Sequence, residues 1–318
     1  MISVVIPSYN RKDCILRLLR DLHAQTVAGF EIIVVDDCSP DDTVEAVRRE
    51  FPKITLLVNE QNGGPCVSRN RGVMAARGEI IVGLDSDVSI NDSELLAKVK
   101  KAFEERPAAS GFAFRIFQPD GITEDTPRWW HPVPVELGKA REFETDYFSG
   151  TGYAFRRTSM VRAGLFPEIL YMHSEEVELA LRILDQGGTL LYRPDLSVVH
   201  HANPVSRRSE IKVFYKPRNQ VLLALRCYPA GRGIRYLVPR LAYGLLQGMR
   251  HGTLRGWFRA MKSAMQLAPR CLQERSAVAG ACWHRMDRMK DLASTAGADP
   301  CFSERSPVHL GHETPGTP

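Results

Sequence analysis

The sequence lacks paired cysteines and any apolar run long enough to cross a membrane. Seven cysteines stand at positions 14, 38, 66, 227, 271, 282 and 301, an odd number with no CxxC spacing. An odd number of scattered cysteines argues against a disulfide framework, and the lack of CxxC spacing argues against a structural zinc site. Free thiols in a reducing, cytoplasmic setting are therefore expected. The N-terminal MISVVIPSYN has neither a basic start nor a long apolar segment, so we do not expect a signal peptide. Without a run of about 18 apolar residues, a membrane-spanning helix is not expected either.

Acidic residues are scarce toward the C-terminus. Between Arg207 and Asp291, 18 Lys and Arg stand against 4 Asp and Glu, a local charge of +14 in a chain of 318 residues that carries +5 overall. An acidic body joined to a basic segment predicts two separate tasks. At 234–268 apolar and aromatic residues alternate with arginines, which is typical of helices that lie on anionic lipid. A solvated basic face packed on the rest of the protein, or a dimer contact, fits the pattern equally. No nucleic-acid-binding motif is present, so nucleic acid is not an expected partner.

The first half of the chain alternates short apolar strands with helices. Strands are expected at 2–6, 31–35, 54–58 and 79–84, and helices at 12–24, from about 39–41, at 65–76 and at 93–106. This alternation predicts an α/β fold with a mostly parallel sheet flanked by helices. Ligands of such sheets collect at the carboxyl ends of the strands.

The second half is less regular. Strands are expected at 111–117, 150–155, 189–192 and 197–200, a helix at 175–186, and a long loop at 118–148. Residues 1–211 are therefore predicted to form the α/β domain. A basic amphipathic helical extension follows at 212–292, with breaks at 229–233 and 239. Residues 293–318, rich in Pro, Ser, Gly and Thr, are predicted to be disordered.

Polar clusters follow three of the expected strands. Asp85-Ser86-Asp87 offers two carboxylates in one turn, which are suitable ligands for Mg²⁺ or Mn²⁺, although an ordinary turn fits equally. Asp36-Asp37 alone is more typical of a turn and helix cap. The Gly63-Gly64-Pro65 turn would let the backbone approach a ligand, and Arg69 could pair with a diphosphate. All of them are expected at one edge of the sheet.

Two further pairs have two interpretations each. Glu175-Glu176 begins a helix, where carboxylates favour the helix dipole, but one of them could also take a proton from a substrate hydroxyl. His200-His201 ends a strand near the sheet edge. Such a pair is more often a surface feature than a metal ligand.

Six segments taken together resemble a known family. VVIPSYNR, IIVVDDCSPDDT, NGGPCVSRNRG, IVGLDSDV, SGTGYAFRRTSMVRAGLFPE and SEEVELALRILDQGG occur in this order within residues 1–206. As a set they resemble the inverting glycosyltransferases of family 2, which have the GT-A fold, with a rhamnosyltransferase-like subgroup as one candidate. The resemblance implies transfer of a sugar from a UDP-, dTDP- or GDP-sugar, with Mn²⁺ or Mg²⁺, to a saccharide or lipid-linked acceptor. Such activity would serve cell-surface polysaccharide, glycolipid or other glycoconjugate synthesis, in the cytoplasm or at the inner membrane surface.

The resemblance assigns donor binding to a group of residues at the sheet edge: Pro7, Tyr9, Asp37, Arg69, Asp85, Gly150, Thr151 and Gly152. Pro7, Tyr9 and Asp37 would line the pocket of the nucleotide base. Arg69 would lie by the diphosphate and Asp85 near the ribose. Gly150-Thr151-Gly152 would lie beside the donor sugar and the acceptor.

Catalytic and metal-binding residues are carried over in the same way. Asp87 would coordinate the cation, and His200 would complete its ligand shell. Glu176 corresponds to the catalytic base, but the family's usual Glu-Asp pair is Glu-Glu here, so Glu175 stays an alternative. The base would deprotonate the acceptor hydroxyl while the cation and Arg69 neutralise the departing nucleoside diphosphate, and one displacement would invert the anomeric centre.

The acceptor site and two rival functions stay open. Trp129 and Trp130 would shape the acceptor site, unless the pair belongs to the core. A catalytically inactive sugar-nucleotide-binding scaffold would have lost the acidic turn or the base, and both are present. A nucleotidyltransferase would carry a GGxGTRL-like loop after the first strand, where this chain has PSYNR.

Overall fold

The computed structural model describes residues 1–201 and 209–295. Its first half alternates as predicted, with boundaries within a few residues of those expected. The elements are β1 (Ile2–Ser8), α1 (Lys12–His23), β2 (Phe30–Asp36), α2 (Thr43–Glu50), β3 (Thr55–Val58), α3 (Gly64–Ala75), β4 (Ile80–Leu84), β5 (Val88–Ser89) and α4 (Leu95–Glu105).

The second half is built from shorter pieces. They are β6 (Gly111–Phe117), η1 (Thr126–Arg128), α5 (Val135–Gly138), β7 (Phe143–Glu144), β8 (Gly152–Arg156), α6 (Arg157–Arg162), η2 (Glu168–Leu170), α7 (Glu175–Asp185) and β9 (Leu190–His200). The segment 118–148, predicted as a loop, thus contains a 3-10 turn, a short helix and a two-residue strand.

One mixed sheet organises these elements, in the order β3-β2-β1-β4-β8-β6-β9-β5, with β7 also paired to β9. β3, β2, β1 and β4 run parallel, whereas β8 lies antiparallel between β4 and β6. The parallel part is nearly continuous in apolar residues because both of its faces are covered. On β1, Val4 and Ile6 face one core with residues of α1, α2 and α4, while Val5 faces the other with residues of α3, α6 and α7.

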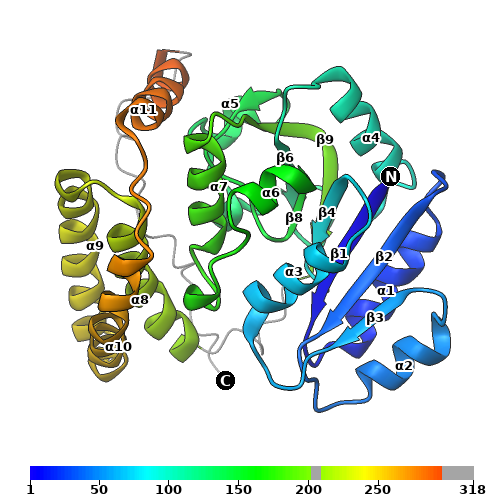
Figure 1. Cartoon of the computed structure of the whole chain (residues 1–318), viewed down its shortest axis with the longest axis horizontal. Coiled ribbons are helices and arrows are strands. Elements are labelled where there is room, and N and C mark those ends of the chain that lie inside the picture. Colours follow the sequence, from blue (N-terminus) through cyan, green and yellow to red (C-terminus); the bar gives the residue numbers. More distant parts are fainter. Residues whose placement is uncertain (202–208, 296–318) are drawn as a thin grey trace, which may run out of the picture.

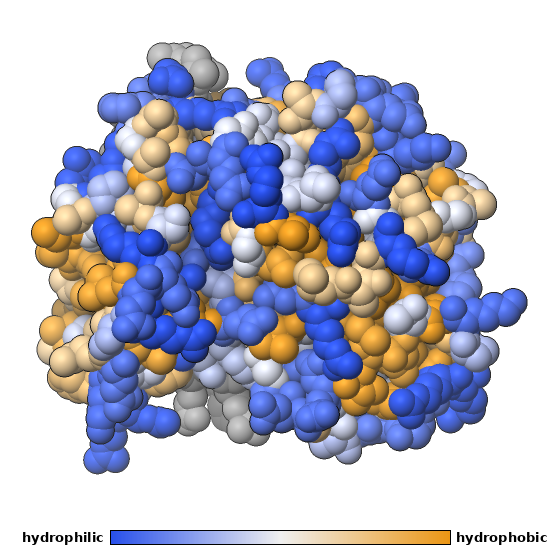
Figure 2. Space-filling view, in the orientation of Figure 1, coloured by the Kyte–Doolittle hydropathy of each residue, from blue (hydrophilic) through white to orange (hydrophobic). Residues whose placement is uncertain are grey.

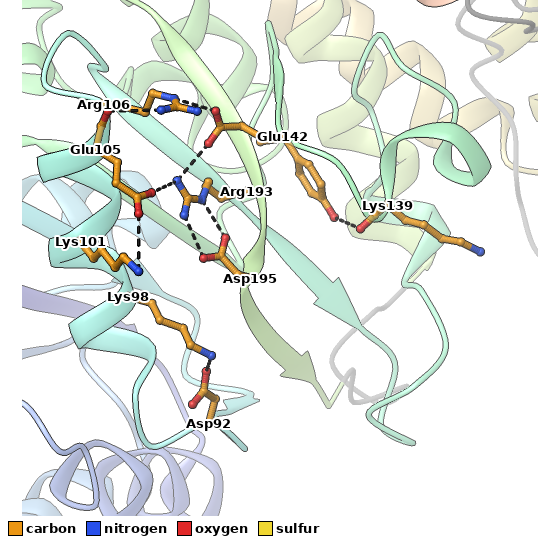
Figure 3. A network of polar contacts seen from close by, with 10 residues as sticks. Asp92, Lys98, Lys101, Glu105, Arg106, Lys139, Glu142, Arg193 and Asp195 are labelled. Carbon is orange, nitrogen blue, oxygen red and sulfur yellow. Dashed lines mark hydrogen bonds and ion pairs between the residues drawn. The ribbon is translucent and has the colours of Figure 1, made fainter.

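β9 corrects a prediction, because the strands expected at 189–192 and 197–200 are one continuous strand. Its pairing with β6 shifts register: Arg193 lies opposite Phe114, but Ser197 lies opposite the next residue, Arg115. Extra residues in one strand form a bulge, a position that tolerates Pro194 without its N–H. Arg193, just before the bulge, pairs with Glu105, Glu142 and Asp195 in a surface network (Figure 3).

Four helices follow: α8 (Ser209–Cys227), α9 (Ala230–Arg250), α10 (Leu254–Gln273) and α11 (Gly280–Thr295). They lie beside α7, on the side of the molecule away from β3 (Figure 1). The break predicted at 239 was wrong, because Pro239 lies inside α9. A proline removes one backbone hydrogen bond, and a long helix with intact turns on both sides can continue past it.

Two predictions concern the C-terminal part of the chain: disorder at 293–318 and the absence of a membrane-spanning helix. α11 extends to Thr295, into the segment predicted to be disordered, and the rest of that segment lies outside the described residues. Within the described residues, no helix is both long enough and apolar enough to cross a bilayer.

Candidate active site

The parallel strands bring the predicted donor residues to one edge. β1 and β2 pair residue for residue until Ser8 lies opposite Asp36, so Tyr9 and Asp37 leave the sheet side by side. Asp85 follows β4, which pairs with the other side of β1. Tyr9 is 46% exposed and Pro7 is half-buried. This is the carboxyl edge, where α/β sheets bind ligands.

The carboxylate of Asp37 is buried and accepts hydrogen bonds from within the protein. It accepts hydrogen bonds from the backbone N–H groups of Gly63 (3.0 Å) and Gly64 (2.8 Å) and from Asn59 Nδ2 (2.7 Å). Gly64 has φ of +81°, and a Cβ there would lie 2.6 Å from the Tyr171 ring, so only glycine fits this turn. Asp37 therefore holds the glycine turn that precedes α3.

Arg69, on α3, joins two predicted site residues. Its guanidinium donates to Asp85 Oδ1 (2.8 Å) and to Glu175 Oε1 (3.0 Å), and its side chain is only 5% exposed. Burial alone would lower the pKa of Arg69, but the carboxylates of Asp85 and Glu175 raise it well above its usual value. Arg69 is therefore a permanent buried cation that fixes both carboxylates.

Glu176 lies beside this network with a different environment. The backbone N–H of Gly150 donates to Glu176 Oε1 (3.3 Å). Burial and the negative charge of Glu175 raise the pKa of Glu176 to about 8, against the opposing effect of Arg69. A Cβ on Gly150 would lie 2.5 Å from Arg69 Nη2, so the close approach requires glycine. The two adjacent glutamates thus differ: Glu175 is ion-paired to Arg69, and Glu176 is a buried carboxyl with a raised pKa.

Asp87 and His200 meet on the other side of the acidic turn. β5 pairs with β9 so that Val88 lies opposite His200, and His200 Nε2 comes within 3.5 Å of Asp87 Oδ2. His200 Nδ1 lies 3.0 Å from Asp125 Oδ2, and Arg11 forms an ion pair with Asp87. Burial would lower the pKa of His200, but hydrogen bonds to Asp125 and Asp87 raise it.

The side chains of Asp87 and His200 are suitable ligands for a divalent cation whose remaining ligands come from a bound molecule. Across residues 1–201 and 209–295, no three or more His, Cys, Asp or Glu side chains are arranged to hold a metal by themselves. Phosphate and water oxygens would complete the shell, as is usual for Mg²⁺ at nucleotides. The contact of His200 Nδ1 with Asp125 is the outer-shell arrangement that orients metal-binding imidazoles.

Three residues of the site were missed in the sequence. Arg128 donates to Thr151 Oγ1 (3.2 Å) and to Asp125 Oδ2 (2.7 Å), and it also contacts His200. It therefore connects Thr151 with His200. Arg11 could have been found, because it lies in the short segment between the end of β1 and the start of α1. Asp125 and Arg128 come from the 118–148 segment and have no spacing that marks them.

The two tryptophans separate in the fold. Trp129 packs edge-on against Tyr192 (ring centroids 5.0 Å apart) and donates to Val133 O (2.7 Å), so it belongs to the core. Trp130 is 42% exposed and stacks on Tyr147 (5.7 Å). Only Trp130 presents a ring to the surface.

Helix α8 fixes the backbone just before the two glutamates. The Asn219 side-chain amide, fully buried, donates to the carbonyls of Leu170 (2.9 Å), Met172 (2.6 Å) and His173 (2.7 Å). His173 and Ser174 have backbone φ angles of 67° and 71°, which residues other than glycine rarely adopt. One side chain from the C-terminal helices thus holds a strained turn next to the site.

Parts of this chain are similar to known proteins. The model of the family described as "Glycosyl transferase family 2" matches residues 3–165. An uncharacterized glycosyltransferase of Haemophilus influenzae is 39% identical over 195 residues, covering 61% of this chain and 65% of that protein. The succinoglycan biosynthesis protein ExoO of Rhizobium meliloti is 36% identical over 32% of this chain and 29% of its own length. The chain thus spans less than two thirds of either relative.

Solved structures share the fold over most of the chain. S. aureus TarS (residues 1–349, with UDP-GlcNAc) matches with a TM-score of 0.58 at 19% identity, over 93% of this chain and 90% of that one. The mannosyltransferase PcManGT of Pyrobaculum calidifontis, in complex with GDP-Man and Mn²⁺, matches with 0.56 at 21% identity, over 92% and 86%. The fold is therefore GT-A, as the resemblance implied. With the family model matching half of its length, this chain belongs to glycosyl transferase family 2.

Proposed function

We propose that this chain is a metal-dependent, inverting glycosyltransferase that moves a sugar from a nucleotide-diphosphate sugar to an acceptor hydroxyl. Glu176 is the general base, and Asp87 and His200 hold Mn²⁺ or Mg²⁺. The observation that carries the proposal is the contrast between the two glutamates. Glu175 is bound to Arg69, whereas burial and the charge of Glu175 raise the pKa of Glu176 to about 8.

Each side chain then has a task that its contacts support. A base with a pKa near the working pH accepts a proton from a hydroxyl efficiently, which suits Glu176. Arg69 keeps Asp85 and Glu175 in place. Asp125 orients the His200 ring. A bound divalent cation would offset the charge of the departing nucleoside diphosphate.

The remaining assignments follow the sequence prediction. Pro7, Tyr9 and Asp37 line the base pocket, and Gly150-Thr151-Gly152 border the donor sugar. Residues 1–211 would form the catalytic domain and 212–292 a helical extension, although the first helix of that extension, α8, begins at Ser209. ExoO is named for succinoglycan biosynthesis, which favours a cell-surface saccharide or lipid-linked acceptor here.

The test is a screen for nucleoside-diphosphate release from UDP-, GDP- and dTDP-sugars with Mn²⁺, Mg²⁺ or EDTA. We expect one donor to be turned over only with the metal, and the product anomer, read by NMR, to be inverted relative to the donor. Metal-independent turnover would contradict the Asp87–His200 assignment. Donor binding by calorimetry without turnover for any acceptor would favour the sugar-nucleotide-binding scaffold instead.

A further inference from the structure

Helix α9 exposes an apolar face that nothing in the described structure covers. In its 21 residues only Gly233 and Gly248 are buried. Ile234, Val238 and Leu246 are 63%, 61% and 56% exposed, and Met249 is 56% exposed. At about 100° per residue these four side chains fall within an arc of about 120°, and at about 1.5 Å per residue they extend over about 22 Å. They form one continuous stripe.

The next helix carries a second stripe. On α10, Phe258, Met265 and Leu272 are 58%, 75% and 53% exposed and stand seven residues apart, so they share one side of the helix. Of the 13 large apolar residues exposed in the described part of the chain, seven thus lie on these two helices. Figure 2 shows apolar patches over α9, interspersed with hydrophilic residues.

Charge identifies the occupant of this surface. No Asp or Glu occurs between Glu210 and Glu274, while this segment holds 12 Lys and Arg. Arg235, Arg250 and Arg255 are exposed on the two helices. A second copy that docked through the same face would bring the same positive charge against it. Nucleic acid would meet the charge but leave the apolar stripes in water. A bilayer with anionic headgroups meets both requirements.

We propose that the outer faces of α9 and α10 form a membrane-binding surface for anionic lipid. Both helices lie along the bilayer, their apolar stripes enter the headgroup region, and the flanking basic side chains contact lipid phosphates. This inference goes beyond the proposed function, since it depends on neither the donor nor the chemistry of the site. It would hold a lipid-linked acceptor close to the enzyme.

The first test measures sedimentation of the full chain with vesicles. We expect binding to vesicles of phosphatidylcholine mixed with phosphatidylglycerol, a decrease as salt rises, and no binding to phosphatidylcholine alone. Absence of binding to the anionic vesicles at low salt would overturn the proposal. The readout needs no turnover, so a failure of the proposed glycosyl transfer does not affect it.

Two sets of variants separate the contributions. Replacing Val238, Leu246, Phe258 and Met265 together by Gln, a good helix former, should weaken partitioning at least about tenfold, because their burial in lipid is lost. Replacing Arg235, Arg250, Arg255 and Lys262 by Gln should weaken it about a hundredfold or more, at about 1 kcal/mol for each charge.

A matched control uses apolar residues that are exposed elsewhere. Met74, Ile122 and Val161 are 57%, 80% and 42% exposed outside the helical extension, and Gln at these positions should leave vesicle binding unchanged. Thermal unfolding verifies that each variant is folded. Equal loss of binding in the control set, or full binding in both test sets, would refute the surface. A dimer that light scattering detects, and that the apolar set dissociates, would make a second copy the occupant instead.

Discussion

Arg69 and Arg193 each hold carboxylates from distant parts of the chain, yet only one of them lies in a candidate active site. Arg69 has a side chain that is 5% exposed, and its partners Glu175 and Asp85 are 4% and 29% exposed. Arg193 is 12% exposed, but its partners Glu105, Glu142 and Asp195 are 37%, 24% and 42% exposed. The geometry of the ion pairs is similar, with distances of 2.8–3.0 Å in both networks.

The difference lies in what surrounds the carboxylates. Water screens the charges around Arg193, so such a network contributes little to stability or chemistry. Around Arg69, water is displaced by Phe166 and α7, and the charge of Glu175 acts on its neighbour Glu176. The two networks therefore shift carboxyl pKa values in opposite directions: hydrogen bonds from Arg193 lower the pKa of Glu105 and of Asp195, whereas burial raises the pKa of Glu176. Each of the following variants tests this contrast.

The largest effect is expected from removing the carboxyl group of Glu176. Glu176→Gln keeps the size of the side chain but cannot accept a proton, so kcat should fall about 10²- to 10⁴-fold. Donor binding by calorimetry should persist. Glu142→Gln, which alters a carboxylate of the surface network, is the control and should leave kcat unchanged. Wild-type turnover in Glu176→Gln would move the base to Glu175 or elsewhere.

Next in size is the loss of the buried cation. Arg69→Met leaves Glu175 buried without its partner, and removing one member of a buried pair costs about 3–5 kcal/mol in the free energy of unfolding. The double variant Arg69→Met/Glu175→Gln should recover part of this loss, because no uncompensated charge stays buried. Denaturant unfolding of the single and double variants measures both. Additive losses would show that the pair is not coupled.

Much of the candidate site could be predicted from the sequence, but not all of it. The strand-end positions of Asp37, Asp85 and Asp87 follow from apolar runs and from the parallel sheet, both of which are local patterns. The surroundings of Glu176 depend on Gly150 and Arg69, which reach it from other elements across the fold. Burial and the proximity of charges raise the pKa of Glu176, and no sequence spacing encodes them.

The C-terminal helices show the same limit. Their basic, amphipathic character is visible in composition, but the hydrogen bonds from Asn219 to a turn about 46 residues earlier are not. Arg128 and Asp125 likewise come from a segment without a recognisable pattern. Tertiary contacts of single polar side chains were the part that sequence reasoning missed.

Asn219→Ala tests whether a neutral buried contact positions the same glutamates. Removing the amide leaves the carbonyls of Leu170, Met172 and His173 without this donor, at a cost of about 1–3 kcal/mol. Because the strained turn leads into Glu175 and Glu176, kcat should also fall while KM for the donor changes little. Leu223→Ala, in the same helix and equally buried, should destabilise without that fall in kcat. An equal decrease of kcat in both variants would reduce Asn219 to a stabilising residue.

A smaller effect is expected from pH. The pKa of Glu176 is raised in the fold, so between about pH 4.5 and 8 the folded state binds more protons than the unfolded one, and stability falls as pH rises. Gln at position 176 mimics the protonated form at every pH. The Tm of Glu176→Gln minus that of the wild type should therefore increase between pH 5 and 8 at constant ionic strength. A constant difference across this range would contradict the shifted pKa.

The smallest effect is expected at the surface network, and it decides whether burial makes the difference. Arg193→Gln removes ion pairs to three carboxylates, more than Arg69→Met removes, so a count of contacts would predict the larger loss. Solvent screening predicts the opposite, a loss of about 0.2–1 kcal/mol for an exposed pair, which shrinks further at high salt. Denaturant unfolding at low and high salt, with turnover measured in parallel, distinguishes the two. A loss comparable to that of Arg69→Met, or a change in kcat, would show that the number of ion pairs matters here more than their burial.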